Sequence, residues 1–266
     1  MAQVTLRATG MVKNQKILNW VAAVCNWVYR HVDRVVVLSS GFKHLLVERG
    51  VASEKLEVIY NWADEKSLET PTGQLPSAFP GSDKFRIVFA GNMGKAQALD
   101  AVLDAAAVLQ SKGSQVCFVM IGGGVEVDRL KARAITLMLN SIVFLPPVSM
   151  AEVGTLLHAA DALLVHLRRD PLFKITIPSK TQAYMAVGKP LVMAVDGDAA
   201  DLVLLSGGGL VAESENSESL VVAIEALQDL SKDERQEMGK RAQSFYMDHL
   251  SLSVGVGKFA KIFNDI

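Results

Sequence analysis

Residues 175–192 read ITIPSKTQAYMAVGKPLV, and this short stretch joins a helix to a buried strand. Pro178 suits a first helical turn, because its φ is already helical and its missing N–H would have no partner there. Gly188 fits the left-handed residue at which a helix ends. The run that starts at Leu191, LVMAV, is apolar enough for a strand covered on both faces. A helix followed by such a strand is typical of a parallel α/β sheet.

The same alternation of strands and helices extends on both sides of this stretch. We expect strands at 85–91, 115–122, 141–146, 161–167, 190–195 and 209–212. We expect the helices between them at 96–110, 125–138, 149–160, 178–186 and 198–206. Elements in this order form right-handed β-α-β units, whose helices cover both faces of the sheet. The predicted fold class is therefore α/β, a doubly wound parallel sheet over residues 83–230.

A change in composition separates this sheet from the start of the chain. Residues 64–83, DEKSLETPTGQLPSAFPGSD, contain three prolines and two glycines and lack apolar periodicity, which is typical of a linker or a long surface loop. We place the linker at 63–82. Residues 1–62 before it hold two helices and two strands, and Ser39 can cap the second helix. Helices over 231–266 complete the chain.

Composition excludes several classes of protein. With 266 residues, half of them hydrophobic, the chain can bury a large core, and its net charge of −1 argues against a dedicated nucleic-acid binder. Cys25 and Cys117 form no metal-spaced pair, and their apolar surroundings predict buried thiols in a reducing cytoplasm. No apolar run reaches the ~20 residues of a spanning helix. We expect a cytoplasmic protein.

The first helix, near residues 13–30, leaves two interpretations open. Its apolar residues recur at helical spacing, with Trp20 and Trp27 among them, and the first 30 residues contain no Asp or Glu. Such a helix can lie on a membrane surface, which would make the protein peripheral at the inner membrane face. It can equally pack against protein, which we favour. Either way, we expect exposed apolar surface around Trp20, Val24 and Trp27.

The loops that follow the strands are the candidate ligand site, because doubly wound sheets bind ligands beyond the carboxyl ends of their strands. In AGNMGKAQ (90–97), Gly91 and Gly94 allow a tight turn and a close backbone approach to a ligand. Asn92 and Lys95 can then reach phosphate oxygens. A plain strand-to-helix turn would look the same.

The second loop, IGGGVE (121–126), places Gly122 and Gly123 directly after a core strand. It lacks the third glycine at the spacing of the dinucleotide fingerprint, so a dehydrogenase is weakly supported. His166 ends a later strand, where a lone histidine is more often structural than functional.

Lys180 is the most informative residue of the third loop and helix. It lies in the first helical turn, opened by Ser179, where the helix dipole disfavours a cation and free N–H groups favour an anion. Gly197 precedes another helix start, with Asp198 as a reasonable cap. Two glycine-bearing helix starts and two lysines suit a diphosphate better than a single phosphate. No set of His, Cys and carboxylates has metal-ligand spacing, so we expect no metal.

Several segments together resemble the family 4 glycosyltransferases, which are retaining enzymes of the GT-B fold. The segments that carry the resemblance are DRVVVLSSGF…NWAD (33–64), IVFAGNMGKAQALDAVLDAA (87–106), VMIGGG (119–124), ADALLVHL (160–167) and IPSK…YMAVGKP (177–190). The residues of these segments are most similar to those of enzymes of bacterial O-antigen, capsule and colanic-acid assembly, including N-acetyl-fucosamine transferases. The resemblance implies that 83–230 is the Rossmann-like C-terminal half of a GT-B fold. It also implies that 1–62 is an incomplete remnant of the acceptor-side domain, toward which 231–266 pack back.

The resemblance also implies a nucleotide-diphospho-sugar donor, which we expect to be UDP-linked, and no bound metal or cofactor. Lys95 and Lys180 would contact the diphosphate and stabilise the charge on the leaving group. The pocket would be shaped by Gly91, Asn92, Gly94, Gly122, Gly123, Ser179 and Gly197. The family commonly carries two glutamates where this chain has Ile175 and Ala183. We therefore expect Gln182 to take over the ribose contact.

The acceptor-side domain of such enzymes is far longer than 62 residues. We therefore expect a donor-binding C-terminal portion, either a truncated reading frame or half of a split enzyme, whose partner would be the N-terminal domain as a separate polypeptide. The expected chemistry is retaining transfer to a lipid-linked or saccharide acceptor in bacterial surface polysaccharide synthesis. The alternative is a non-catalytic module that binds nucleotide sugars. A third alternative is a nucleotide-sugar epimerase of GT-B type.

Overall fold

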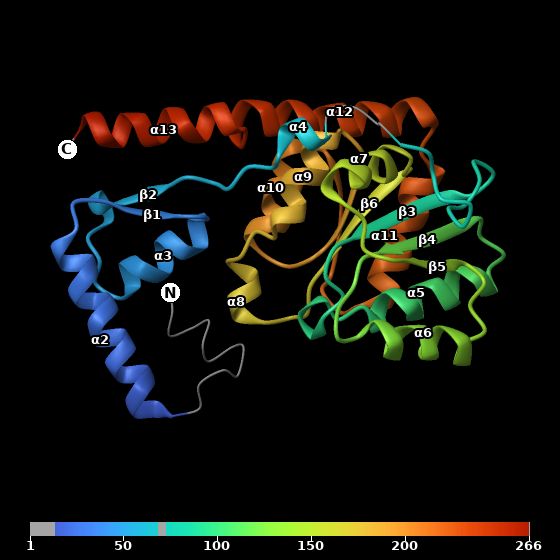
Figure 1. Ribbon diagram of the computed structural model, residues 1–266, viewed down its shortest axis with the longest axis horizontal. Helices are drawn as coiled ribbons and strands as arrows, with labels where there is room; N and C mark the ends of the chain where they lie inside the picture. Colours follow the sequence, from blue (N-terminus) through green and yellow to red (C-terminus); the bar gives the residue numbers. More distant parts are fainter. Residues whose placement is uncertain (1–13, 69–72, 266) are drawn as a thin grey trace.

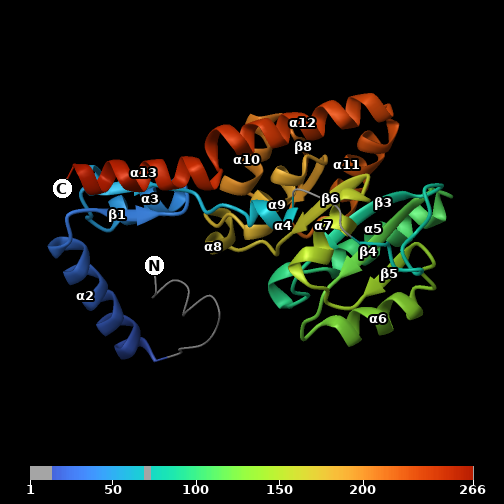
Figure 2. The same ribbon diagram turned by 45° about the horizontal axis from the view of Figure 1, so that its top comes forward.

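The structure is a computed structural model that describes residues 14–68 and 73–265, and it has two parts (Figure 1). We call residues 14–58 the N-terminal segment and residues 85–250 the sheet domain. Helix α12 (Lys232–His249) lies on the sheet domain, and α13 (Leu252–Asn264) continues from it across the N-terminal segment (Figures 1 and 2). The two parts are therefore joined both by the chain at 59–84 and by the C-terminal helices.

The sheet domain is built on six parallel strands. They are β3 (Phe85–Ala90), β4 (Val116–Ile121), β5 (Ile142–Leu145), β6 (Ala162–His166), β7 (Leu191–Ala194) and β8 (Gly209–Ala212). Their spatial order is β5-β4-β3-β6-β7-β8, so the chain runs outward in one direction from β3 and then reverses at β6. This is the doubly wound, Rossmann-like order, and the predicted fold class is confirmed.

Helices cover both faces of this sheet and form two apolar cores. The first core joins the sheet to α5 (Asp100–Ser111), α6 (Val127–Thr136) and α11 (Ser217–Asp229). The second joins it to α7 (Met150–His158), α9 (Ser179–Val187), α10 (Asp198–Ser206) and α12. Along β3, Ile87 and Phe89 enter the first core and Val88 enters the second, because successive strand residues point to opposite faces.

Three of the predicted helix ends are confirmed. The Ser39 hydroxyl accepts from the N–H of Phe42 at the start of α3 (Ser40–Glu48), and Ser149 forms a capping box at the start of α7. Gly188 ends α9 in the left-handed conformation, with φ of 75°. Pro178 is displaced by one position from its prediction, since it is the extended N-cap residue and α9 begins at Ser179.

The N-terminal segment has the same kind of elements on a smaller scale. Helix α2 (Gln15–His31) precedes β1 (Val35–Val37), and α3 leads to β2 (Leu56–Val58), which pairs in parallel with β1. These two strands form a separate sheet. Its core of buried residues consists of Val37, Leu46, Val51 and Leu56.

The segment predicted as a linker is anchored to the sheet domain. It contains a short helix, α4 (Glu65–Leu68), and its residues Ala63, Leu68 and Phe79 are buried in the second core. The Tyr246 hydroxyl of α12 accepts from the N–H of Ala63 at 3.0 Å and donates to Glu65 Oε1 at 2.8 Å. The chain between the two parts is therefore held against α12.

Candidate functional site

The candidate site lies where the strand order reverses, between β3 and β6. Pairing of these strands ends at Val88 and Leu163, although β3 continues to Ala90 and β6 to His166. Beyond that point the Tyr184 hydroxyl of α9 accepts from the N–H of Ala90 at 2.8 Å and donates to its carbonyl at 3.2 Å. The two strands thus separate at their carboxyl ends, where open sheets of this kind bind ligands.

The two glycine loops predicted to shape the pocket pack against each other. The N–H of Gly91 donates to Ile121 O at 2.9 Å, and the N–H of Met93 donates to Gly123 O at 2.7 Å. Gly122 has φ of 133°, and a Cβ there would lie 2.1 Å from Gly91 O. Glycine is therefore required at 122 by the contact between the loops.

Lys180 brings a charged group to this edge. Part of its stem is exposed, but Nζ is shielded from solvent and lies 3.5 Å from the centroid of the Phe89 ring, a cation–π contact. A Cβ on Gly91 would lie 3.4 Å from Nζ, so the glycine loop and the lysine adjoin. Among residues 14–68 and 73–265, nothing offers Nζ a hydrogen bond. Burial lowers the pKa of Lys180 from 10.5 to about 7.

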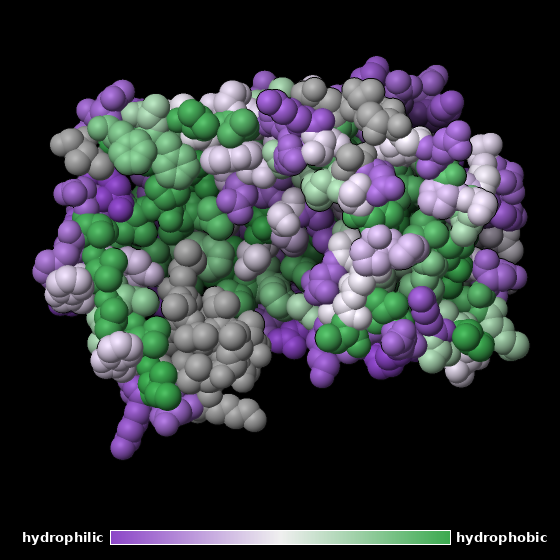
Figure 3. All heavy atoms as spheres, viewed as in Figure 1, coloured by the Kyte–Doolittle hydropathy of each residue, from purple (hydrophilic) through white to green (hydrophobic). Residues whose placement is uncertain are grey.

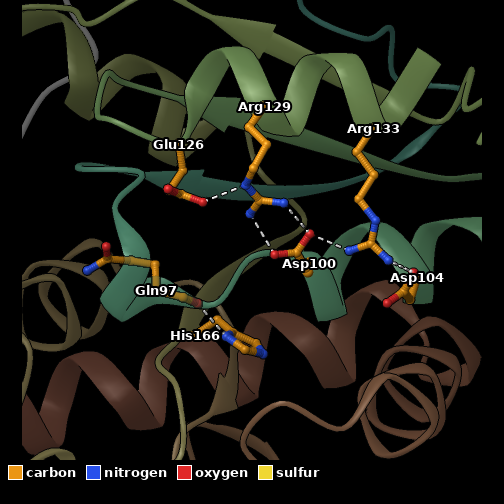
Figure 4. Close-up of polar contacts among 7 residues, drawn as sticks. All are labelled: Gln97, Asp100, Asp104, Glu126, Arg129, Arg133 and His166. Carbon is orange, nitrogen blue, oxygen red and sulfur yellow. Dashed lines mark hydrogen bonds and ion pairs between the residues drawn. The ribbon is translucent and has the colours of Figure 1, made fainter. Parts of the chain in front are cut away.

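His166, which ends β6, lies under the loop that follows β3 (Figure 4). Its side chain is 1% exposed, and Nδ1 lies 2.6 Å from Gln97 O. Burial lowers the pKa of the imidazole, and the charge of Lys180 lowers it further, against the opposing effects of Gln97 O and Glu215. The sequence places this histidine at the end of a core strand, but only the fold shows that it lies beside Lys180.

The helices that follow the two glycine loops are joined by ion pairs (Figure 4). Asp100 of α5 accepts hydrogen bonds from Arg129 and Arg133 of α6, and Arg129 also pairs with Glu126 at 2.6 Å. The hydrogen bond from Arg129 is the largest cause that lowers the pKa of Asp100 to about 2. These pairs hold the starts of α5 and α6 together behind the loops.

The other predicted site residues are less closely gathered. Lys95 is exposed in a short 3-10 turn (Lys95–Gln97), and its ammonium bonds to none of the described residues. Asn92 and Ser179 are exposed. Gln182 is 1% exposed, and with its amide nitrogen turned toward its own helix start it donates to Pro178 O at 2.8 Å. The structure therefore groups Gly91, Gly122 and Lys180, and leaves Lys95 at the surface.

The start of α10 differs from the prediction in its helix cap. Gly197 is the N-cap residue, and a Cβ there would lie 2.1 Å from Lys174 O. The prediction that Asp198 caps this helix is wrong. Its Oδ2 accepts from the N–H of Gly41 at 2.7 Å, at the start of α3, where a carboxylate is favoured by the helix dipole.

The same place holds the second tie between the two parts of the molecule. The Ser39 hydroxyl donates to Ile175 O at 2.5 Å, and a Cβ on Gly41 would lie 2.4 Å from Ile175 Cγ2. Ile175, which stands where the resembling family carries a glutamate, thus contacts the N-terminal segment. The start of α3 is therefore fastened to the carboxyl edge of the sheet.

The described part of the chain was searched for clusters of metal-ligating side chains and for helices that could span a membrane. Within residues 14–68 and 73–265, no cluster of His, Cys, Asp and Glu could hold a metal ion. None of the helices in those ranges is both long and apolar enough to cross a membrane. Cys117 is buried as predicted, whereas Cys25 is half-buried.

The fold and this edge define a Rossmann-like α/β domain whose candidate ligand site lies at the strand reversal. Comparison of the sequence with protein families identifies the group more closely: the family model described as "Glycosyl transferases group 1" matches residues 76–245. The chain belongs to this family.

Curated relatives carry the same family character. The chain is 24% identical over 241 residues to the probable glycosyltransferase WbjE of Pseudomonas aeruginosa, covering 88% of this chain and 58% of the relative. It is 26% identical over 234 residues to the putative colanic acid biosynthesis glycosyl transferase WcaI of Escherichia coli, covering 84% and 56%. The chain thus spans little more than half the length of these relatives.

Solved structures share the fold. The structure of HepE from Anabaena in complex with UDP superposes with a TM-score of 0.76 at 20% identity, covering 91% of this chain and 66% of that chain. A glycosyltransferase from Rickettsia africae superposes with a TM-score of 0.74 at 18% identity, covering 88% and 63%. Both likenesses include the N-terminal segment as well as the sheet domain, because each covers more of the chain than the sheet domain alone.

Proposed function

We propose that this chain is the donor-binding part of a glycosyltransferase, which holds a UDP-linked sugar at the carboxyl edge of the sheet. The observation that carries the proposal is the Lys180 ammonium, which is shielded from solvent at the strand reversal and has no anionic partner among the described residues. A diphosphate would supply that partner. The relatives WbjE and WcaI and the UDP complex of HepE support the choice of ligand class.

The proposed roles follow from position. Lys180, with Lys95 approaching from the exposed turn, would stabilise the negative charge on the departing diphosphate. The free N–H groups at the start of α9, near Ser179, would bind its oxygens. Gly91, Gly94, Gly122, Gly123, Gly197 and Asn92 would shape the pocket. A ribose contact by Gln182 requires its amide to leave the carbonyl of Pro178.

The proposed reaction is retaining glycosyl transfer to a lipid-linked or saccharide acceptor in bacterial surface polysaccharide synthesis, with no bound metal or cofactor. At its most specific, the proposal is an enzyme similar to the N-acetyl-fucosamine transferases. The alternative is a non-catalytic nucleotide-sugar module or one subunit of a split glycosyltransferase. Release of UDP from UDP-sugars by the full chain, with and without a lipid-linked acceptor, separates transfer from binding alone.

Calorimetric titration of the full chain tests the binding proposal. Without added metal, UDP and UDP-N-acetylglucosamine should bind, and Lys180→Met should lower both affinities at least tenfold, because the buried charge is lost. Lys240→Met is the matched control, since Lys240 is an exposed lysine that pairs with Glu237 on α12. Binding that Lys180→Met leaves unchanged, or no binding of any nucleotide by the wild type, would contradict the proposal.

We further propose that the N-terminal segment packs against additional polypeptide. Hydrophobic residues gather over this part of the molecule (Figure 3), and Trp20 and Trp27 of α2 are 69% and 62% exposed. Exposed apolar surface was predicted around these two residues and Val24, and it is confirmed. Parallel strands such as β1 and β2 normally belong to sheets covered on both faces, which favours protein over membrane as the covering surface.

Vesicle and size measurements test this second proposal. The full chain should self-associate or bind further protein, and Trp20→Ser with Trp27→Ser should reduce that association. The full chain should not float with vesicles that contain anionic lipid. Flotation that the double substitution abolishes would replace the protein partner with a membrane surface.

A further inference from the structure

Two polar atoms at the strand reversal lack hydrogen-bond partners among the described residues. His166 Nε2 and Lys180 Nζ are both shielded from solvent, and neither atom has a hydrogen-bond partner in the described ranges. They lie close enough for the charge of Lys180 to act on the imidazole. A buried polar group without a hydrogen-bond partner destabilises the folded protein, so each of these two atoms needs an explanation.

The contact with Gln97 determines what His166 Nε2 can do. A carbonyl oxygen only accepts hydrogen bonds, so Nδ1, at 2.6 Å from Gln97 O, must carry the proton. In the neutral ring Nε2 then has a lone pair and no hydrogen, which makes it an acceptor. Burial and the charge of Lys180 both oppose a second proton, while Glu215 favours one. His166 therefore presents a buried acceptor, and Lys180 a buried donor, at the same edge of the sheet.

This pairing distinguishes between the groups of a nucleotide sugar. The oxygens of an ionised diphosphate only accept hydrogen bonds, so they match Lys180 Nζ and cannot pair with the lone pair of Nε2. A hydroxyl can donate to Nε2. Ile175 and Ala183, at the two positions where the resembling family carries glutamates, offer no side-chain acceptor for a hydroxyl.

We propose that His166 is a specificity-determining residue, whose Nε2 accepts a hydrogen bond from a hydroxyl of the bound nucleotide sugar while Lys180 contacts the diphosphate. This inference rests on the proposed function. Because His166 ends β6 at the strand reversal, the hydroxyl would bind at the carboxyl end of this strand. The ribose and the transferred sugar are the two possible sources of that hydroxyl.

Two substitutions separate the nitrogens of the ring. His166→Asn keeps a donor near the Nδ1 position, and so the contact with Gln97 O, but removes the acceptor at Nε2. His166→Gln places an amide near the Nε2 position, where its oxygen can still accept, and loses the Nδ1 donor. Calorimetric titration of both full-length variants uses UDP, UDP-glucose, UDP-N-acetylglucosamine and inorganic pyrophosphate, with thermal unfolding to compare their stability.

We expect His166→Asn to weaken binding of the UDP-sugars roughly tenfold. His166→Gln should stay within about threefold of the wild type, even if it unfolds at a lower temperature. If UDP itself binds unchanged to the Asn variant, the hydroxyl belongs to the sugar; if UDP weakens too while pyrophosphate does not, it belongs to the ribose. Equal losses in both variants, no loss in His166→Asn, or equal weakening of pyrophosphate would overturn the inference. If the wild type binds pyrophosphate but no nucleotide, the inference and the proposed function both fail, whereas loss confined to Lys180→Met refutes only the role of His166.

Discussion

The sheet domain and the N-terminal segment use the same parallel α/β pattern with different results. In the sheet domain six strands are covered on both faces, and side chains as large as Phe118 and Tyr184 are fully buried. In the N-terminal segment two strands share one small core, while Trp20 and Trp27 stay exposed. Burial of apolar surface on both faces, rather than the presence of strands and helices, therefore distinguishes the sheet domain from the N-terminal segment.

The largest predicted effect tests whether the two parts unfold together. Phe118→Ala removes a ring from the first core and should lower the free energy of unfolding of the sheet domain by about 3–5 kcal/mol. Leu46→Ala removes one buried side chain from the small core of the N-terminal segment. It should leave the unfolding transition of the sheet domain unchanged. In urea unfolding, circular dichroism reports mainly on the sheet domain. Fluorescence reports on the N-terminal segment and on the start of the connecting chain, because Trp20, Trp27 and Trp62 are the three tryptophans of the chain.

Coincident transitions by both probes in every variant would contradict this separation. They would mean that the ties at Glu65 and Asp198 couple the parts into one cooperative unit, and that the small core of the segment is no measure of its stability.

A second prediction concerns Lys180, a charged group in the sheet domain whose burial opposes stability. Burial lowers the pKa of Lys180 to about 7, so between about pH 7 and 10.5 the unfolded chain binds more protons than the folded chain. Through Lys180, the free energy of unfolding then rises with pH across that window. Lys180→Met should therefore stabilise the protein at pH 6, by about 2–5 kcal/mol, and the gain should shrink as pH rises toward 10. Urea midpoints of both proteins at several pH values measure it.

A constant difference across that pH range would mean that Lys180 stays charged in the folded protein. Lys189→Met serves as a comparison, because burial also lowers the pKa of Lys189, but its position after Gly188 is away from the strand reversal.

The third prediction cuts the tie between the two parts. Asp198→Ala leaves the N–H of Gly41 at the start of α3 without its acceptor, which should cost about 1–2 kcal/mol. This loss of stability should appear in the fluorescence of the N-terminal segment and in faster proteolysis before residue 60. Asp201→Ala is the matched control, since Asp201 is exposed in the same first turn of α10. Equal effects of the two substitutions would show that the helix start of α10, and not the tie, is being measured.

The sequence predicted the sheet domain well because its signals are local. Alternating strands and helices, the Ser149 cap and the Gly188 helix end are each encoded within a few neighbouring residues. The misassignment of Asp198 has the opposite cause, since its partner, Gly41, is 157 positions away in the chain. The same holds for the candidate site. Lys180 was identified from its unfavourable place in a helix, but its contact with Phe89 and its proximity to His166 depend on the strand order.

The smallest predicted effect lies on the surface of the sheet domain, at Asp100. The hydrogen bond from Arg129 is the main reason that the pKa of Asp100 falls from 3.8 to about 2. A lowered carboxyl pKa stabilises the folded state above about pH 4, and this contribution is lost as pH falls toward 2. The side chains of Asp100 and Arg129 are 39% and 50% exposed, so solvent screening should hold the cost of Asp100→Asn below about 1 kcal/mol. Urea midpoints at pH 7 and pH 3 should show a difference that narrows at the lower pH.

Glu225→Gln, which breaks the exposed pair with Lys112, is the control for a surface ion pair remote from the glycine loops. If Asp100→Asn also weakens UDP binding while Glu225→Gln does not, the ion pairs between α5 and α6 position the loops at 91–94 and 122–124. In that case the stability of the sheet domain and the geometry of its carboxyl edge depend on different contacts: the former on its two cores, the latter on a surface cluster that contributes little to folding. A difference in urea midpoint that does not change with pH, together with unchanged UDP binding, would show that Asp100 is an ordinary surface residue.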